Sequence, residues 1–364
     1  MLQAPPSHHA MLDRLIADLQ ALPDVRVDAA HGLNSGAVES WPHARLLLQA
    51  AGRPITVLVE LKKAVYPRDA RGLVWRVRAA RGRGPQDGSE DNVHAMVVAE
   101  EVSPGAKELL AAERVGYYDG GGSLYLPAPG AYLFVQKPAP KSQSRAMRSL
   151  FTGRRAQVLH AMLLHHKDWF GVKDLAERTG VLPSTVSPVL AELERQDWVQ
   201  TRGQGPFKQR QLSDPAALLD AWAKDASSNT TADLRRYFVP AAGSGNVLER
   251  LDRAFDSAHA TYALSFEAAA QRYTPFLSSV SQLRVRTLDA SATTAALTAL
   301  GARPVGEGAN LVVLAAKSAG VLQFRERVDG VWLASPIQVY LDLLSAEGRA
   351  KEMAEHLRKE RIGF

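Results

Sequence analysis

The chain has 364 residues, of which 46% are hydrophobic and 23% charged, and its formal net charge is +6. This length predicts two or three domains, each with its own core. The sequence contains no cysteine, which excludes disulfides, zinc–thiolate sites and cysteine nucleophiles and fits a reducing cytoplasm. The N-terminus has no apolar signal core, and no stretch approaches the roughly 20 apolar residues of a membrane span. We therefore expect a cytoplasmic protein.

Residues 1–136 predict an α/β domain. Ser103 and Pro104 give a strong start signal for one of its helices, as N-cap and first helical residue. In chain order, we expect a helix at 8–22, a hairpin of strands at 44–52 and 54–63, a basic helix near 68–81, a strand at 94–101, a helix from 103 and two short strands within 115–137.

The strand at 54–63 raises the question of whether this domain cuts DNA. Glu60 and Lys62 are two residues apart, so a strand places both side chains on the same face. Glu-x-Lys after an apolar run is half of a metal-dependent nuclease site, in which the carboxylate helps to hold Mg²⁺ and the lysine stabilises phosphate charge. A solvated strand end is the commoner explanation of the tripeptide alone.

A second carboxylate would be needed to complete such a site, because Mg²⁺ usually takes more than one negative ligand. The preceding strand contains no acid, and the nearest candidates are Glu39, Asp28 and Asp24. If the protein is a nuclease, its catalytic residues are Glu60, Lys62 and Glu39. We expect instead a domain that keeps a nuclease-like shape, holds DNA and does not cut it.

Basic residues are concentrated in two blocks, which favours nucleic-acid contact over a merely solvated face. The first block, between residues 62 and 83, contains a single acidic residue, Asp69. Its basic residues are Lys62, Lys63, Arg68, Arg71, Arg76, Arg78, Arg81 and Arg83. The second has no acid and comprises Lys137, Lys141, Arg145, Arg148, Arg154 and Arg155. Residues 137–152, rich in proline and serine, predict a basic linker.

Residues 153–226 predict a winged helix-turn-helix, a DNA-binding module. Two helices, at 154–166 and 171–180, precede a third at 182–200, in which Val186, Leu190 and Leu193 have the spacing of a buried face. Two strands joined by the glycine-rich Gly-Gln-Gly-Pro then form the wing. A winged helix used for protein contacts is the alternative.

The third helix begins with small polar residues, Ser184, Thr185 and Ser187, which let a recognition helix sit deep in the major groove. Pro188 predicts a kink or distortion nearby. Five cations are expected to meet phosphates, on the wing or at the start of the first helix: Arg202, Lys208, Arg210, Arg154 and Arg155.

Residues 235–364 alternate helices and strands and predict a second α/β domain. The sequence shows no phosphate loop, metal-ligand cluster or nucleophile motif, so we expect neither cofactor nor metal. Gln338, Tyr340 and Asp342 suggest a polar site, or else the start of an amphipathic helix, and we favour the helix.

The stretches DPAALLDAWA, TYALSFEAAAQRYTPF and SPIQVYLDLLSAEGRAKEMAEHL resemble AbiEi-type antitoxins, the transcriptional regulators of type IV toxin–antitoxin systems. The VELKK, PRDARG, VVAEEVSPGAKELL and VGYYDGGGSLYL runs resemble the longer members of that group. The resemblance implies a front domain similar to restriction endonucleases, ahead of a central winged helix and a C-terminal α/β domain. In the better-known antitoxins, which are shorter, the winged helix lies at or near the N-terminus.

The resemblance further implies a DNA-binding autorepressor, and the incomplete Glu60-x-Lys62 motif predicts that the protein is not an enzyme. Its expected partner is the double-stranded operator upstream of its own operon. It would counter a nucleotidyltransferase-type toxin without forming a stable complex, in a toxin–antitoxin or phage-defence operon, and could act as a homodimer. The alternatives are a Mg²⁺-dependent nuclease targeted by the winged helix and a protein-interaction scaffold.

Overall fold

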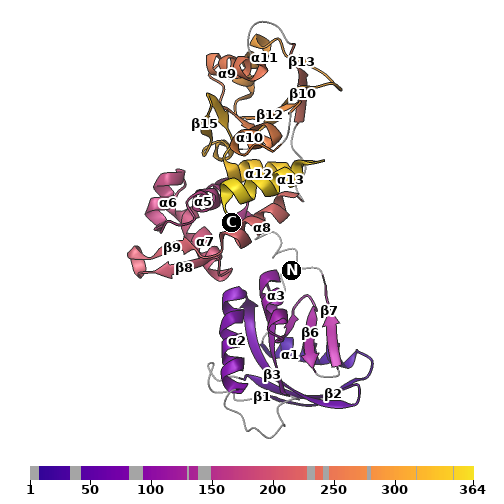
Figure 1. The fold of residues 1–364 in the computed structure, drawn as a ribbon. Helices are drawn as coiled ribbons and strands as arrows, with labels where there is room; N and C mark the ends of the chain where they lie inside the picture. Colours follow the sequence, from indigo (N-terminus) through magenta and orange to yellow (C-terminus); the bar gives the residue numbers. More distant parts are fainter. Residues whose placement is uncertain are drawn as a thin grey trace, which may run out of the picture. The chain divides into compact units, whose positions relative to one another are not determined.

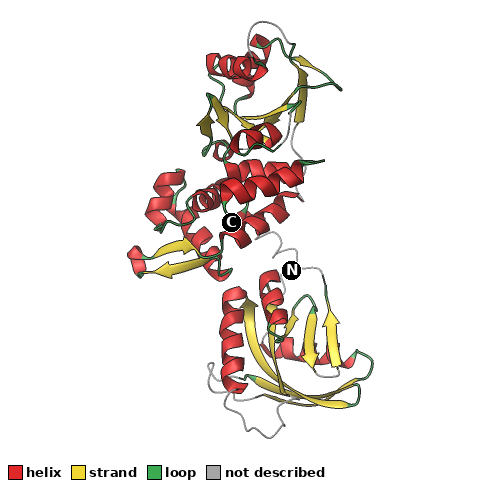
Figure 2. Ribbon diagram, viewed as in Figure 1, coloured by secondary structure: helices red, strands yellow, loops and turns green. Residues whose placement is uncertain are grey.

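The computed structural model describes residues 8–32, 42–81, 93–128, 131–137, 149–227, 234–240, 246–276, 280–316, 318–346 and 348–364. The chain forms two compact units. The first holds Met1–Met147 with Glu192–Asp197, and the second holds Arg148–Ala191 with Trp198–Phe364. Both mix helices and strands (Figures 1 and 2). Within these ranges, no helix has the length and apolarity needed to cross a membrane.

The first unit is built on a seven-stranded sheet whose order follows the chain from β1 to β7. Strands β3, β4 and β5 run parallel, and the other neighbours pair antiparallel. Its elements are α1 (His8–Gln20), β1 (Val25–Gly32), β2 (Ala44–Ala50), β3 (Arg53–Val65), α2 (Pro67–Arg81), β4 (Val93–Val102), α3 (Pro104–Ala112), β5 (Gly116–Asp119), β6 (Leu124–Ala128) and β7 (Ala131–Val135).

Two details of this unit differ from the sequence-based expectation. Strand β1 was not predicted, although Val25, Arg26, Val27 and Asp28 alternate apolar and polar side chains as a half-buried strand does. The segment 115–137 holds three strands, β5, β6 and β7, instead of two. Strand β6 also continues through Pro127, a residue that usually marks the end of a strand. The expected cap is present: the Ser103 side chain accepts a hydrogen bond from the Ala106 N–H at 3.3 Å.

Helices cover both faces of this sheet, which buries two apolar cores. On one face, Leu15 of α1 packs in a cluster with Val59 of β3. On the other, Leu73 of α2 and Leu110 of α3 pack with Val97 of β4. Side chains alternate between the faces of a strand, so residues next to Val59 in β3 point toward α2 and α3.

The expected winged helix lies in the second unit, except for Glu192–Asp197 at the end of its third helix, which are grouped with the first unit. The elements of the winged helix are α5 (Gly153–Leu164), α6 (Val172–Thr179), α7 (Pro183–Arg195), β8 (Val199–Arg202), the 3₁₀ turn η2 (Gly205–Phe207), β9 (Gln209–Leu212) and α8 (Pro215–Ser227). Gly180 ends α6 with φ of 65°, a left-handed conformation that glycine adopts without steric cost. This glycine makes the turn from α6 into α7.

The rest of the second unit carries another sheet, with the strand order β13-β10-β14-β12-β11-β16-β15. Its elements are β10 (Leu234–Phe238), α9 (Val247–Ser257), β11 (Tyr262–Ser265), α10 (Phe266–Tyr273), β12 (Leu283–Thr287), α11 (Ala290–Ala299), β13 (Arg303–Pro304), β14 (Leu311–Ala315), η3 (Ala319–Val321), β15 (Glu326–Val328), β16 (Val331–Leu333), α12 (Pro336–Leu344), α13 (Ala350–Leu357) and the π-helical turn η4 (Arg358–Ile362).

The winged helix is docked on this C-terminal part by packing and by specific polar contacts. Helix α12 packs on α8 and α5, and α5 packs on η3. The imidazole Nε2 of His160 in α5 is hydrogen-bonded to the hydroxyl of Ser335, the N-cap of α12. Gln157 Nε2 donates to Gln323 Oε1 at 3.2 Å, and a Cβ at Gly320 would lie only 2.1 Å from Gln157 Nε2. A side chain at 320 would therefore force Gln157 to shift.

Candidate nucleic-acid interface

Helix α7 separates an apolar face from a hydroxyl-bearing one at its N-terminal end. Val186, Leu190 and Leu193 are fully buried. Ser184 and Ser187 are consequently exposed, while Thr185, next to the buried Val186, is partly buried. The start of α7 therefore presents short hydrogen-bonding side chains to solvent, as a recognition helix requires.

Pro188 does not end α7, which extends from Pro183 to Arg195. It lies close to the first turn, where the loss of one N–H costs less than it does deeper in a helix. The carbonyl of Ser184 loses its i+4 donor as a result. Pro188 itself is exposed on the same side as Ser184 and Ser187.

The wing is a two-stranded ribbon in which Arg202 of β8 pairs with Gln209 of β9. Arg202 is exposed but held in place: its Nε donates to Gln209 Oε1 at 2.9 Å, and its guanidinium lies 4.3 Å from the ring centre of Trp169. Lys208 and Arg210 are partly buried, and Arg210 Nη1 donates to the Lys208 carbonyl at 3.1 Å. Arg202 is thus the most accessible of the three expected wing cations.

Phe207 at the tip of the wing is a candidate contact that we did not predict. Its side chain is 84% exposed, which is unusual for a large aromatic residue. Apolar side chains can insert between base steps in the minor groove. An aromatic residue directly after the turn Gly-Gln-Gly-Pro was the signal in the sequence.

Arg154 and Arg155 lie in the first turn of α5 and are exposed. Arg154 Nη1 donates to the carbonyl of Gly180 at 3.4 Å, which brings this cation to the turn before α7. Arg155 Nη1 donates to Ser149 Oγ at 2.8 Å. The structure therefore places one of these two arginines beside the recognition helix.

In the first unit, Glu60 is buried on the α2 side of the sheet, and its carboxylate forms an ion pair with Arg76. Arg76 Nη2 lies 2.6 and 2.5 Å from the two carboxylate oxygens, and Lys62 Nζ lies 3.3 Å from Oε1. The side-chain pairing of Glu60 with Lys62 is as expected. The role of Arg76 was not predicted, because nothing in the sequence relates residues 16 positions apart on a strand and a helix.

A histidine, His43, lies directly before β2, the strand that pairs with the Glu60 strand β3. Ala44 of β2 pairs with Val59 of β3, and the His43 N–H donates to the Val59 carbonyl at 2.9 Å. His43 Nδ1 accepts from the Leu61 N–H at 3.3 Å. Glu39 lies outside the described residues, and no group of three potential metal ligands occurs among those that are described.

The first basic block does not form one uniform surface. Arg68, Arg71 and Arg78 are exposed and, at helical spacing, lie along one face of α2 together with Trp75, which is 71% exposed. Lys63 is exposed on β3, whereas Arg76 turns inward to Glu60. The side chain of Arg81 and all of Arg83 lie outside the described residues.

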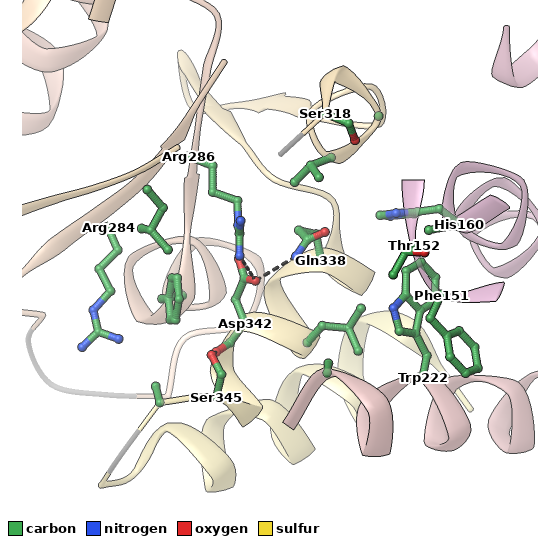
Figure 3. Close-up of a pocket in the computed structure, with 18 of the residues that line it drawn as sticks. Phe151, Thr152, His160, Trp222, Arg284, Arg286, Ser318, Gln338, Asp342 and Ser345 are labelled. Carbon is green, nitrogen blue, oxygen red and sulfur yellow. Dashed lines mark hydrogen bonds and ion pairs between the residues drawn. The ribbon is translucent and has the colours of Figure 1, made fainter. Parts of the chain in front are cut away.

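Helix α12 is both a packed amphipathic helix and the position of a buried polar network. Val339, Leu341 and Leu343 are buried, as expected for a packed helix. Asp342 is buried too, and Arg286 binds it in a bidentate manner, with Nε 2.8 Å from Oδ2 and Nη2 2.5 Å from Oδ1 (Figure 3). Gln338 Nε2 donates to Asp342 Oδ1 at 2.8 Å, and the Ser265 hydroxyl donates to Oδ2.

Comparisons with known proteins identify two parts of the second unit. Residues 153–203 match the IclR helix-turn-helix domain. Residues 211–362 match the family described as "Transcriptional regulator, AbiEi antitoxin, Type IV TA system". The resemblance to AbiEi-type regulators is therefore confirmed. The two matches indicate a DNA-binding regulator of a toxin–antitoxin system.

Solved structures show weaker similarity. The structure of EndoMS in apo form is 18% identical over 35% of this chain and 49% of its own, with a TM-score of 0.23. NolR from Sinorhizobium fredii is 21% identical over 25% of this chain and 95% of its own, with a TM-score of 0.18. The matched segment thus spans about half of the EndoMS chain. No curated protein sequence is similar enough to count as a match.

Proposed function

We propose that this AbiEi-type regulator binds a double-stranded operator upstream of its own operon and represses that operon. The observation that carries the proposal is the N-terminal end of α7, where exposed Ser184 and Ser187 stand opposite a fully buried apolar face. Short hydroxyl side chains bring the helix backbone close to base edges, which is where sequence is read.

The cations around α7 supply phosphate contacts, which position the module but do not carry sequence information. Arg202 is held by Trp169 and Gln209, so little side-chain freedom is lost when it meets a phosphate. Arg154, beside the turn before α7, contacts the backbone next to the same groove. Lys208, Arg210 and Arg155 extend this contact surface.

The match of residues 211–362 to an antitoxin family supports a role in countering a toxin. We propose a nucleotidyltransferase-type toxin that is neutralised without a stable complex, and a homodimer that reads a repeated half-site. In the first unit, both oxygens of Glu60 are held by Arg76, so a metal ion would have to displace a guanidinium. This unit therefore adds phosphate contacts and does not cleave DNA.

A gel-shift titration with the DNA upstream of the gene, in the presence of Mg²⁺ and unrelated competitor DNA, tests the function. We expect a discrete shift of intact DNA that survives the competitor. Ser184→Ala combined with Ser187→Ala should reduce operator affinity about tenfold and leave non-specific binding unchanged. The matched control is Ser257→Ala, an exposed serine at the end of α9.

Neutralising the wing tests the phosphate contacts separately. Arg202→Gln should weaken operator and non-specific binding alike and lower the salt slope by about 0.9. Binding that never exceeds the competitor level would contradict the repressor function. Cleavage of the DNA by the unaltered protein, and no cleavage by Glu60→Ala, would show instead that the first unit is a nuclease.

A further inference from the structure

A pocket of about 730 Å³ lies within the second unit, between the winged helix and the C-terminal sheet (Figure 3). One wall is formed by α5 and α8, and it includes Thr152, His160 and Trp222. The opposite wall is formed by strands β10, β12 and β14, and α12 contributes Gln338 and Asp342. Its volume is in the range of sites for small organic ligands.

The strand register places three arginines on the sheet face that lines this pocket. Val312 in the central strand β14 pairs with Arg236 of β10 on one side and with Arg284 of β12 on the other. The next row on the same face contains Arg286. A single sheet face thus carries three guanidinium groups on two strands that flank an apolar one.

These arginines differ in how far their charge is already compensated. Arg286 is neutralised by the bidentate bond to Asp342. Arg284 is only loosely paired: its Nη1 lies 3.8 Å from Glu267, and its Nε donates to Gln282 at 3.1 Å.

Arg236 is exposed, and its side chain makes no hydrogen bond or ion pair with any residue that the structure describes. The pocket therefore holds one uncompensated and one weakly compensated cation.

The winged-helix wall offers a complementary group. Gln157 lines the pocket, and its Oε1 is buried without a hydrogen-bond donor among the described residues. A buried acceptor without a donor costs about 1–3 kcal/mol, and a ligand hydroxyl or amine would relieve this cost only if the Gln157 side chain turned toward the pocket. Trp222 and Val312 add apolar surface for a carbon skeleton.

We propose that this pocket binds a small organic acid whose carboxylate or phosphate group is held between Arg236 and Arg284. Guanidinium groups form bidentate hydrogen bonds with both kinds of anion. The arginine pair would therefore recognise the acidic group of the ligand whatever the rest of its structure. The ligand would contact the sheet and α5 together, because both line the same pocket.

Such a ligand would also alter DNA binding, and this second step rests on the proposed function. Helix α5 belongs to the DNA-binding module. A ligand that contacts both α5 and the sheet favours the conformation in which the winged helix is docked on the C-terminal part. If that conformation differs in operator affinity, ligand and DNA affect each other's affinity by the same factor.

Isothermal titration of the full chain tests the site without DNA. The probes are inorganic phosphate, succinate and adenosine 5′-monophosphate, each up to about 10 mM, the weak end of ligand affinities. We expect saturable 1:1 binding of at least one probe. Arg236→Gln should weaken it at least tenfold, and Arg284→Gln should do the same. Because Arg236 is exposed, its variant is expected to keep the fold.

The matched control is Arg235→Gln, which removes the same charge from the adjacent position, on the opposite face of β10. Equal loss of binding in the Arg235 and Arg236 variants would overturn the site, and so would the absence of saturable binding of all three probes. Preference for succinate or for the phosphate compounds identifies the acidic group.

The operator gel shift repeated with saturating probe then tests the coupling. We expect a change in operator affinity that is lost in Arg236→Gln. Failure of the DNA-binding proposal would leave the titration result standing, so the two failures can be distinguished.

Discussion

The two units each bury a carboxylate against an arginine, but the two pairs are built differently. Asp342 receives hydrogen bonds from Arg286, Gln338 and Ser265, and the Arg286 side chain is only 16% exposed. Glu60 is met by two cations, and the side chain of Arg76 is 38% exposed. The first pair is a closed network in a helix-to-sheet contact, whereas the cationic side of the second remains open to water.

The comparison predicts that Asp342→Ala has the largest effect on stability. It leaves a buried guanidinium without its counterion, a change that costs about 3–5 kcal/mol in free energy of unfolding. Hydrogen exchange measured by mass spectrometry should show the loss in peptides of α12 and β12. The control is Asp220→Ala, whose carboxylate is 58% exposed beside Arg358 and should cost less than about 1 kcal/mol. Equal effects in the two variants would show that Asp342 does not belong to a closed network.

His160, which is hydrogen-bonded to the N-cap of α12, should have the next-largest effect on stability, through its pH dependence. Burial lowers the pKa of this imidazole from 6.5 to about 4. The unfolded chain therefore binds a proton between pH 6.5 and 4 that the folded chain does not, and stability falls as the pH is lowered through this window. The expected loss is about 3 kcal/mol. Urea unfolding at several pH values should show a smaller slope in His160→Gln, and an unchanged slope would contradict this account.

Glu60→Gln should have a smaller effect than Asp342→Ala, although both carboxylates are buried. Arg76 is partly hydrated and can turn toward solvent, so we expect a loss of about 1–3 kcal/mol. Hydrogen exchange in peptides covering β3 and α2 measures it. A loss as large as that in Asp342→Ala would mean that the Glu60 pair is closed as well.

Lys62→Ala should have the smallest effect. Its ammonium group is 3.3 Å from Glu60 and its side chain is 33% exposed, so solvent screens most of the attraction. Such pairs contribute about 0–1 kcal/mol. A larger loss in the same β3 peptides would show that Lys62, and not Arg76, is the main partner of Glu60.

Local signals predicted much of this architecture. The Ser103 cap, the buried stripe of α7 and the shared face of Glu60 and Lys62 depend on neighbours within a few residues, and spacing alone reveals them. The sequence does not predict strand β10 individually, because the two consecutive arginines in Leu-Arg-Arg-Tyr-Phe break the alternation of apolar and polar residues. Its place in the sheet comes from pairing with β14, far along the chain.

The pairings that define the sites are long-range and were not predictable from spacing. Arg76 reaches Glu60 only because α2 crosses that face of the sheet. Arg236 and Arg284 are brought to one face because β14 lies between their strands, in an order that the chain does not follow. No single-sequence pattern encodes a strand order of this kind.

The docking of α5 on the C-terminal part restricts how such regulators can exchange their DNA-reading heads. A winged helix recombined from another gene would have to bring a histidine that reaches Ser335 and a side chain that fits over Gly320. A winged helix without the histidine would lose the hydrogen bond to the N-cap of α12. Substitutions in the exposed turn of α7 leave these contacts untouched, whereas replacement of the whole winged helix does not.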